Sequence, residues 1–427
     1  MISNFDLDNF ISTYVTRRSQ SLLADDFLKY NSELNSRING KSVLVIGGAG
    51  TIGSSYIKAI LHFKIKKIVV VDNNENGLTE LVRDLRSTTA YNIPEDFITY
   101  PVNFGDVVFE KIFRQHGPFE IVANFAAHKH VRSEKDIFSI EAMIENNVIR
   151  ARKLLDLLLQ FPPEHFFCVS TDKAANPVNI MGASKKLMEE LIMAYSDKLP
   201  IKTARFANVA FSNGSLPLGF LERLNKRQPW SCPLGIRRFF VSPQESGELC
   251  LMASIMGESG DIFFPKLDEE KDMIPFDQIA LDLLKTLGLT PDICQSEEEA
   301  KQKAQLLQNN PSSLSPLVSQ SPSPPVPQSP PPSTYPIYFF GSDTSGEKAF
   351  EEFFTEKEQL DLDSFINLGV VKNSKKRSIQ EIDAIFNQLR ILFESQNVTK
   401  AAIVNVLKEY LSNFDHIETG KGLDSKM

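Results

Sequence analysis

Residues 41–209 alternate short apolar runs with stretches that are long enough for helices. The apolar runs are Val43–Ile46, Ile68–Val71, Phe97–Val102, Ile121–Phe125, Phe166–Val169 and Thr203–Val209. The stretches between them that suit helices are Ser54–Phe63, Leu78–Ser87, Ile140–Leu159 and Ala183–Ser196. Runs that are apolar throughout are typical of strands buried on both faces of a parallel sheet. The pattern therefore predicts an α/β fold with a doubly wound parallel sheet over residues 41–210.

Four further parts surround this sheet. Residues 1–40 place apolar side chains at helical spacing, which predicts a helical extension docked on the main body or on a partner subunit. Residues 211–311 predict a smaller α/β lobe. Residues 312–336 are rich in Ser and Pro, since ten of the 24 prolines lie between Pro311 and Pro336. They predict a disordered insert, with a proline-motif ligand as the alternative. Residues 337–427 predict a strand and helices, including Ile379–Glu394 and Thr399–Asn413, that return to the smaller lobe.

Charge, cysteines and hydropathy exclude several classes of protein. The net charge of −8 argues against a broad nucleic-acid-binding surface. The cysteines are far apart and form no C-x-x-C pair, so we expect neither a disulfide framework nor a zinc site. The N-terminus is too polar for a secretory signal, and 18 apolar residues never run together. We therefore expect a cytoplasmic protein without a membrane span.

A glycine cluster follows the first apolar run and fits G-x-x-G-x-x-G at Gly47, Gly50 and Gly53. Glycine lets the backbone turn tightly and approach a pyrophosphate, while the next helix offers its N-terminal amides to that anion. Asp72 ends the next apolar run, nineteen residues after Gly53, where an acid can bind an adenosine ribose. The sequence thus predicts a Rossmann-like domain that binds NAD, with NADP less favoured. An ordinary βα turn is the alternative.

Two further segments should line the same cleft, because they follow predicted strands whose carboxyl ends meet at one edge of the sheet. The first contains His128, Lys129 and His130. No carboxylate or cysteine stands at metal-ligand spacing, so we expect no metal, and Lys129 is the natural anion contact. The second contains Asp172 and Lys173, an acid and a base in one place. A salt-linked loop with a helix cap is the alternative, which the glycine cluster makes less favoured.

Taken in order, these motifs resemble the extended short-chain dehydrogenases/reductases, and more closely the UDP-N-acetylglucosamine 4,6-dehydratases of polysaccharide biosynthesis. The motifs are the glycine cluster, Ala126-Ala127-x-Lys129-His130-Val131, Ser170-Thr171-Asp172-Lys173-Ala174, Met181-x-x-x-Lys185 and Arg205-Phe-Ala-Asn208-Val209. The resemblance covers about Lys41 to Pro265. It implies that residues 41–210 bind NAD, that residues 211–311 bind a UDP-sugar, and that the protein forms a homo-oligomer.

The resemblance also implies the roles of individual residues. Cofactor binding falls to Gly47, Gly50, Thr51, Ile52, Gly53, Asp72, Asn103, Phe104, Ala126, Ala127, Lys129 and Lys185. Substrate binding falls to Lys129, His130, Asn208, Ser215 and Arg238. Catalysis falls to Thr171, Asp172, Lys173, Met181 and Lys185. In this scheme Lys173 removes the C5 proton of a 4-keto sugar, Asp172 protonates the departing C6 hydroxyl, and Thr171 contacts the C4 oxygen.

One position departs from the superfamily pattern. Met181 stands four residues before Lys185, where the superfamily has a tyrosine, and a thioether cannot accept the C4 hydroxyl proton. Lys185, Asp172 or a chain of waters would have to accept that proton. An NAD-dependent epimerase and a non-catalytic sugar-nucleotide-binding homologue therefore remain as alternatives. The C5 stereochemistry of the product is not fixed by the sequence. We also expect Lys129, Lys173, Lys185, Arg205 and Arg238 to gather around the two pyrophosphates.

Overall fold

The large sheet follows the predicted α/β pattern. The computed structural model describes residues 5–309, 334–341, 351–374, 376–395 and 397–418. The sheet has nine strands in the order β14-β15-β10-β6-β5-β4-β1-β2-β3. Their bounds are β1 Ser42–Ile46, β2 Lys67–Asp72, β3 Asp96–Pro101, β4 Ile121–Asn124, β5 His165–Val169, β6 Ile201–Ala204, β10 Ile262–Pro265, β14 Gln359–Asp361 and β15 Leu368–Lys372. The seven strands from β3 to β10 are parallel, so the carboxyl ends of β1, β2, β4 and β5 meet at one edge.

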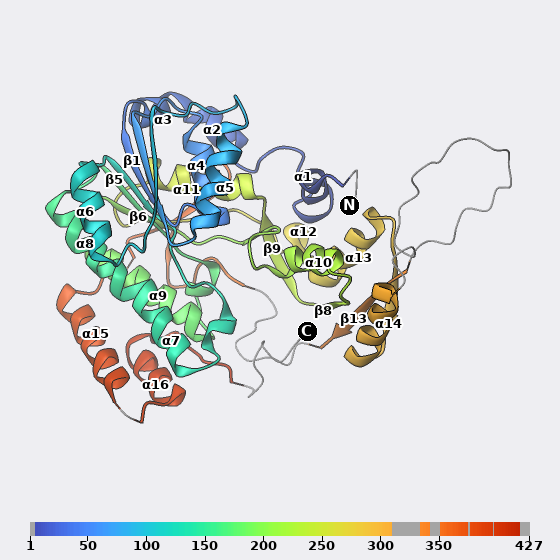
Figure 1. The fold of residues 1–427 in the computed structure, drawn as a ribbon. Coiled ribbons are helices and arrows are strands. Elements are labelled where there is room, and N and C mark those ends of the chain that lie inside the picture. The colour runs from blue at the N-terminus through green and yellow to red at the C-terminus, as the bar shows by residue number, and fades with distance from the viewer. Residues whose placement is uncertain (1–4, 310–333, 342–350, 375, 396, 419–427) are drawn as a thin grey trace.

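Helices cover both faces of this sheet, as expected for strands that are buried throughout. On one face α4 (Thr51–Ile60) packs against α11 (Pro243–Met256), with α5 (Glu75–Arg86) nearby (Figure 1). On the other face lie α6 (Val107–His116), α7 (Ile137–Ile144), the π-helical turn η3 (Glu145–Ile149), α8 (Arg150–Gln160) and α9 (Ile180–Ala194). The predicted doubly wound fold is confirmed.

The smaller lobe is built on two three-stranded sheets. One joins β11 (Met273–Pro275), β9 (Arg237–Val241) and β7 (Asn208–Val209). The other joins β12 (Thr290–Cys294), β13 (Thr334–Phe340) and β8 (Trp230–Pro233), all parallel. Its helices are α10 (Leu216–Asn225), α12 (Glu269–Asp272), α13 (Phe276–Thr286) and α14 (Glu297–Asn309). The core of this lobe includes Phe220, Trp230, Leu283 and Tyr335, all fully buried.

The N-terminal residues are helical and lie on the main body. They form α1 (Leu7–Phe10), the π-helical turn η1 (Ile11–Val15), α2 (Ala24–Lys29) and α3 (Asn31–Ile38). Phe10, Ile11 and Val15 are buried in the core of the smaller lobe, whereas Leu23 and Leu34 are buried in the core of the large sheet. The extension therefore spans both lobes, as α1 and α3 show in Figure 1.

The C-terminal segment departs from expectation. Among the described residues of 337–427, only β13 returns to the smaller lobe as predicted. β15 pairs with β10 and β14 pairs with β15, both antiparallel, so they extend the large sheet. The helices α15 (Ile379–Glu394) and α16 (Lys400–Tyr410) pack on each other, and α15 contacts α9 (Figure 1). The antiparallel edge could not be read from the sequence because β15 pairs with β10, which lies far away in the chain.

The structure also differs from two predicted boundaries, that of the strand over Thr203–Val209 and that of the smaller lobe. The apolar run Thr203–Val209 is two strands in different sheets, since β6 ends at Ala204 and β7 begins at Asn208. β10 and α11 fall within residues 211–311 but belong to the large sheet and its covering layer. Most of the Pro-rich insert lies outside the described residues, and its last residues, from Thr334, already belong to β13.

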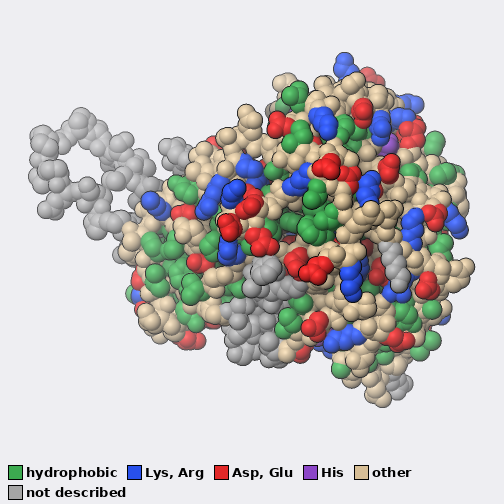
Figure 2. All heavy atoms as spheres, turned by 180° about the vertical axis from the view of Figure 1, so that it is seen from behind, with side chains coloured by type: hydrophobic (Ala, Val, Ile, Leu, Met, Phe, Trp, Pro, Cys, Tyr) green, Lys and Arg blue, Asp and Glu red, His purple; other side chains and the backbone are tan. Residues whose placement is uncertain are grey.

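Cys168, Cys232, Cys250 and Cys294 are buried and form no disulfide. None of the helices in the described ranges is long and apolar enough to cross a bilayer. Likewise, no cluster of three metal-ligating side chains occurs among the described residues. On the face drawn in Figure 2, acidic and basic side chains are interspersed.

Candidate active site

The glycine cluster forms the turn between β1 and α4. Gly47 has φ +78°, and a Cβ added there would lie 2.5 Å from the Ala126 nitrogen. A Cβ on Gly53 would lie 2.2 Å from the Gly47 carbonyl oxygen, so both positions require glycine. A Cβ on Gly50 would meet only the Gly47 oxygen, at 3.6 Å. Gly50 is the N-cap of α4 and makes no side-chain cap hydrogen bond, so this helix start can receive an anion.

Asp72 closes β2 beside this turn. One carboxylate oxygen accepts a hydrogen bond from the Ala49 nitrogen at 2.9 Å, and the other accepts one from the Asn74 nitrogen at 2.9 Å. Each oxygen keeps a second lone pair for hydroxyl donors. The carboxylate is thus fixed in orientation and can still bind a diol.

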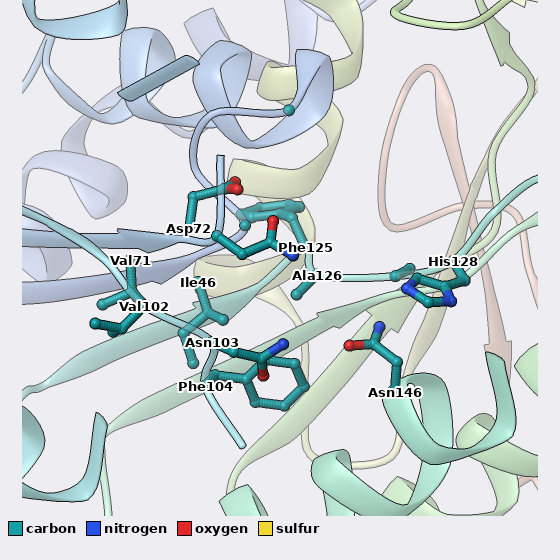
Figure 3. A pocket seen from close by; sticks show the side chains of 14 residues that line it. Ile46, Val71, Asp72, Val102, Asn103, Phe104, Phe125, Ala126, His128 and Asn146 are labelled. Atoms are coloured by element: carbon teal, nitrogen blue, oxygen red, sulfur yellow. The ribbon is translucent and has the colours of Figure 1, made fainter. Parts of the chain in front are cut away.

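A pocket opens between these elements. Its volume is about 620 Å³, open solvent at the mouth included. Of the predicted cofactor residues, Gly47, Gly50, Asp72, Asn103, Phe104, Ala126 and Ala127 line it. In Figure 3, Asp72 lies at one end of the pocket and His128 and Asn146 at the other, with Asn103 and Phe104 along one side. We call this the glycine-loop pocket.

A second pocket adjoins the first, because Phe125 and Ala127 line both. Its volume is about 1080 Å³, open solvent included. Ten of the predicted site residues line it, namely Ile52, Ala127, Lys129, His130, Thr171, Lys173, Met181, Lys185, Asn208 and Ser215. We call it the lysine pocket. Because the two pockets adjoin, a dinucleotide in the glycine-loop pocket could lie next to a second ligand in the lysine pocket.

Lys173 lines the lysine pocket and forms a hydrogen-bonded ion pair with Asp172, which does not line it. Asp172 Oδ1 lies 3.0 Å from Lys173 Nζ, and it accepts a hydrogen bond from Thr171 Oγ1 at 2.8 Å. Burial lowers the pKa of Lys173, but the carboxylates of Asp172 and Glu351 outweigh burial and raise that pKa above its ordinary value. The two carboxylates thus favour the ammonium form of Lys173.

The other catalytic candidates lie on α9. Met181 and Lys185 are both buried, at 3% and 4% exposed, and both line the lysine pocket. Lys185 Nζ donates to the Val169 carbonyl oxygen at 2.9 Å. Burial is the main cause that lowers the pKa of Lys185, so this side chain gives up its proton more readily than an exposed lysine.

Four predicted residues do not line either pocket. Thr51 lies on the first turn of α4 and accepts a hydrogen bond from the Asn213 nitrogen at 3.0 Å, which ties the glycine turn to the 212–215 loop. Gly53 packs inside the turn, as described above. Asp172 is 4% exposed and lies behind Lys173. Arg238 is 6% exposed, and its guanidinium donates to the Arg237 carbonyl oxygen.

Arg205 corrects the expectation of a positive cluster around two pyrophosphates. Its side chain is fully buried and binds Glu189 through two nitrogens, at 2.9 and 2.8 Å. It also binds Glu358 at 2.9 Å, so its charge is neutralised inside the protein. A guanidinium between two carboxylates is unavailable to a phosphate, and spacing in the sequence could not reveal those partners.

Sequence reasoning missed two contributors. Asn147 lies in η3, where its side chain bonds both backbone groups of His128 and donates to Ser184 Oγ at 3.0 Å. Ser184 in turn donates to the Met181 carbonyl oxygen, so Asn147 joins the strand-end loop to α9. The adjacent asparagines in a predicted apolar helix were the available signal. Glu351, close to Lys173, gave none because it follows the Pro-rich insert.

Residues 43–304 match the family described as "Polysaccharide biosynthesis protein", which is more than half of the chain. The chain is 28% identical over 264 residues to a probable polysaccharide biosynthesis protein of Bacillus subtilis, covering 61% of this chain but 43% of that one. The match thus spans less than half of that relative's length. It is also 28% identical to an inverting UDP-N-acetylglucosamine 4,6-dehydratase of Campylobacter jejuni, covering 55% of this chain and 69% of that one.

Similarity extends to epimerases and to a solved structure. A UDP-glucose 4-epimerase of Rickettsia massiliae is 30% identical over 53% of this chain and 66% of its own. The X-ray structure of Pen from Bacillus thuringiensis superposes with a TM-score of 0.59 at 19% identity, covering 82% of this chain and 98% of that one. That likeness concerns the fold. With the glycine turn and the Ser170–Ala174 block in place, the chain belongs to the polysaccharide biosynthesis protein family, a branch of the extended short-chain dehydrogenases/reductases.

Proposed function

We propose that this chain is a nucleotide-sugar 4,6-dehydratase that converts UDP-N-acetylglucosamine to a UDP-4-keto-6-deoxy-N-acetylhexosamine with NAD. The observation that carries the proposal is Lys173, which is paired with Asp172 and lines a pocket that adjoins the glycine-loop pocket. The similarity to Campylobacter dehydratases supports the same substrate. The product would serve polysaccharide synthesis, in keeping with the family description.

The residues of the glycine-loop pocket fit a dinucleotide. Side chains at Gly47 and Gly53 would close the turn, whereas the open space at Gly50 lets a pyrophosphate approach the start of α4. Asp72 would hold the adenosine ribose through its remaining lone pairs and would repel the extra phosphate of NADP. NAD, when bound, supplies the hydride acceptor for sugar C4 and the donor that returns the hydride to C6.

The Asp172–Lys173 pair can move the two protons that dehydration requires. Lys173 must be neutral to accept the C5 proton, and its ammonium can pass a proton to Asp172 across their 3.0 Å hydrogen bond. Asp172 then supplies the proton with which the C6 hydroxyl leaves as water. Thr171 bonds to Asp172 and lines the pocket, so its hydroxyl can relay that proton. Lys173 finally returns a proton to C5, and the proton released from the C4 hydroxyl restores the Lys173 ammonium through solvent.

Lys185 is the proposed acceptor of the C4 hydroxyl proton, since Met181 cannot serve. Lys185 lines the lysine pocket, and burial lowers its pKa. Asp172 is a weaker candidate because Thr171 and Lys173 lie between it and the pocket. Lys129, His130, Asn208 and Ser215 would bind the UDP-sugar from the pocket wall.

An NAD-dependent epimerase is the second candidate, favoured by the similarity to Rickettsia epimerases. Asp172 and Lys173 favour dehydration, because C4 epimerisation needs no acid for the C6 hydroxyl. The test is to incubate the purified chain with UDP-N-acetylglucosamine and NAD and to record the product by mass spectrometry and NMR. Loss of one water supports the proposal. Unchanged mass with altered C4 stereochemistry supports the epimerase, and unaltered substrate with either NAD or NADP removes both.

A further inference from the structure

Glu351, which lies outside the residues matched by the family, contacts Lys173 without lining the lysine pocket. Glu351 follows the Pro-rich insert, far outside the matched residues 43–304. Its Oε1 lies 3.6 Å from Lys173 Nζ, and its side chain is 5% exposed. Lys173 therefore sits between two carboxylates, one from its neighbour Asp172 and one from a segment almost 180 residues later.

The segment that carries Glu351 is anchored to the large sheet. Arg205 donates to the Phe353 carbonyl oxygen at 3.1 Å and binds both carboxylate oxygens of Glu358 at 2.9 Å. The Phe353 ring stacks on Phe264 of β10, with centroids 6.3 Å apart. Buried contacts on two sides fix the backbone next to Glu351, so its place beside Lys173 is built into the fold.

The charges around Lys173 come from three elements. Asp172 and Glu351 are negative and favour the ammonium, whereas Arg238 on β9 is positive and opposes it. Burial also opposes the ammonium, yet the net effect is a raised pKa for Lys173. Asp172 also accepts hydrogen bonds from Thr171 Oγ1 and from the Lys173 backbone nitrogen. Glu351 is a second carboxylate that raises the pKa of Lys173, and it lies outside the Ser170–Ala174 block.

We propose that Glu351 is a positioning residue that holds Lys173 as an ammonium facing the lysine pocket and so sets the pH range in which Lys173 can act as a base. Glu351 does not line the pocket and would act only through Lys173. The inference deepens the proposed function and rests on it for its catalytic meaning. The protonation of Lys173 can nevertheless be measured without turnover.

The test is the pH dependence of Lys173 acylation by a small amine-reactive reagent, followed by peptide mass spectrometry on the full-length protein. Only the neutral amine reacts. In Glu351→Gln the rate constant for Lys173 at pH 8 should rise at least about threefold over wild type, because one of two adjacent carboxylates is lost. Glu351→Asp keeps the charge and should remain closer to wild type than Glu351→Gln does.

Glu352→Gln is the matched control. Glu352 is the next residue, is exposed, and accepts a hydrogen bond from Asn176 Nδ2 at 2.9 Å. In Glu352→Gln the rate constant for Lys173 acylation should equal that of wild type. Equal Lys173 rates in wild type and Glu351→Gln, with thermal unfolding showing both proteins folded, would overturn the inference. So would an equal rise in Glu352→Gln. If Glu351→Gln does not fold, Glu351→Asp decides, since a rate raised more than threefold despite the retained charge contradicts the inference.

A second readout separates this inference from the proposed function. In an active enzyme, the basic limb of the kcat/KM profile should move to lower pH in Glu351→Gln, because Lys173 then loses at lower pH the proton that it passes to Asp172. An active enzyme whose profile and Lys173 labelling both stay unchanged overturns the inference alone. A wild-type protein that leaves UDP-N-acetylglucosamine unchanged overturns the proposed function, while the labelling result still decides the role of Glu351.

Discussion

The two adjoining pockets are built in different ways. The glycine-loop pocket is shaped by main chain, since Gly47 and Gly53 admit no side chain and Asp72 is oriented by backbone nitrogens. The lysine pocket depends on side-chain charges brought from distant segments, among them Lys173 and, behind it, Glu351. A short stretch of sequence determines the backbone geometry of the glycine turn. The charges around Lys173, in contrast, come together only when distant segments of the chain fold against each other. Mutations should therefore affect the two pockets differently.

Lys173→Ala should separate the two pockets most clearly, because it should greatly reduce turnover and leave dinucleotide binding unchanged. Water loss from UDP-N-acetylglucosamine should fall by about 10³-fold, since a positioned acid–base group contributes a factor of that order. The bound dinucleotide, measured by mass spectrometry of the released cofactor, should stay at the wild-type level because Lys173 does not line the glycine-loop pocket. Lys186→Ala, on the adjacent α9 and outside both pockets, is the control. Near-normal turnover in Lys173→Ala would remove this lysine from the mechanism.

Arg205→Met should have the next largest effect, on folding rather than on chemistry alone. It leaves Glu189 buried without its guanidinium, which should lower the free energy of unfolding by about 3–5 kcal/mol. Urea unfolding followed by fluorescence measures this. Arg83→Met provides the comparison, because its 3.8 Å pair with Glu80 is exposed and should contribute no more than about 1 kcal/mol. Equal losses in the two variants would contradict the structural role of Arg205.

A pair of glycine variants tests the main-chain pocket. Gly53→Ala should cost about 1–3 kcal/mol of stability, because its Cβ would lie 2.2 Å from the Gly47 oxygen. Gly50→Ala should change stability by less than about 0.5 kcal/mol, yet weaken dinucleotide binding, because its Cβ would enter the pocket. Thermal unfolding and titration calorimetry measure the two effects. Unaltered dinucleotide affinity in Gly50→Ala would speak against the pyrophosphate at this turn.

Lowering the pH should weaken the buried pair of Glu189 and Arg205 gradually, with a smaller effect on the free energy of unfolding than the substitutions above. Burial alone would raise the pKa of Glu189, but Arg205 outweighs burial and lowers it to about 2. A carboxyl with a depressed folded-state pKa stabilises the protein above its unfolded pKa, and this stability is lost as the pH falls toward 2. The difference in unfolding free energy between wild type and Glu189→Gln should therefore shrink as the pH falls from 5 to 3. A constant difference would show that Glu189 does not titrate in this way.

The sequence predicts the fold where a pattern is local. The parallel strands β1 to β6 and the helices α4, α5, α9, α15 and α16 were all expected, because each is a run of one periodicity. The antiparallel edge formed by β14 and β15 was not, since it joins the large sheet through the pairing of β15 with β10, which lies far away in the chain. The same reason explains the sites. Gly47, Asp72 and Lys173 belong to motifs, whereas the burial of Arg205 and the approach of Glu351 depend on packing between distant segments.

The central proposal, dehydration by the lysine pocket next to a bound dinucleotide, is tested most directly by turnover in D₂O. UDP-N-acetylglucosamine should lose one water, and the product should carry one solvent deuterium at C5, because the proton taken by Lys173 exchanges before C5 is reprotonated. NMR and mass spectrometry of the isolated product report both. A product that retains the mass of the substrate, or one that has lost water without gaining deuterium at C5, would contradict the proposal.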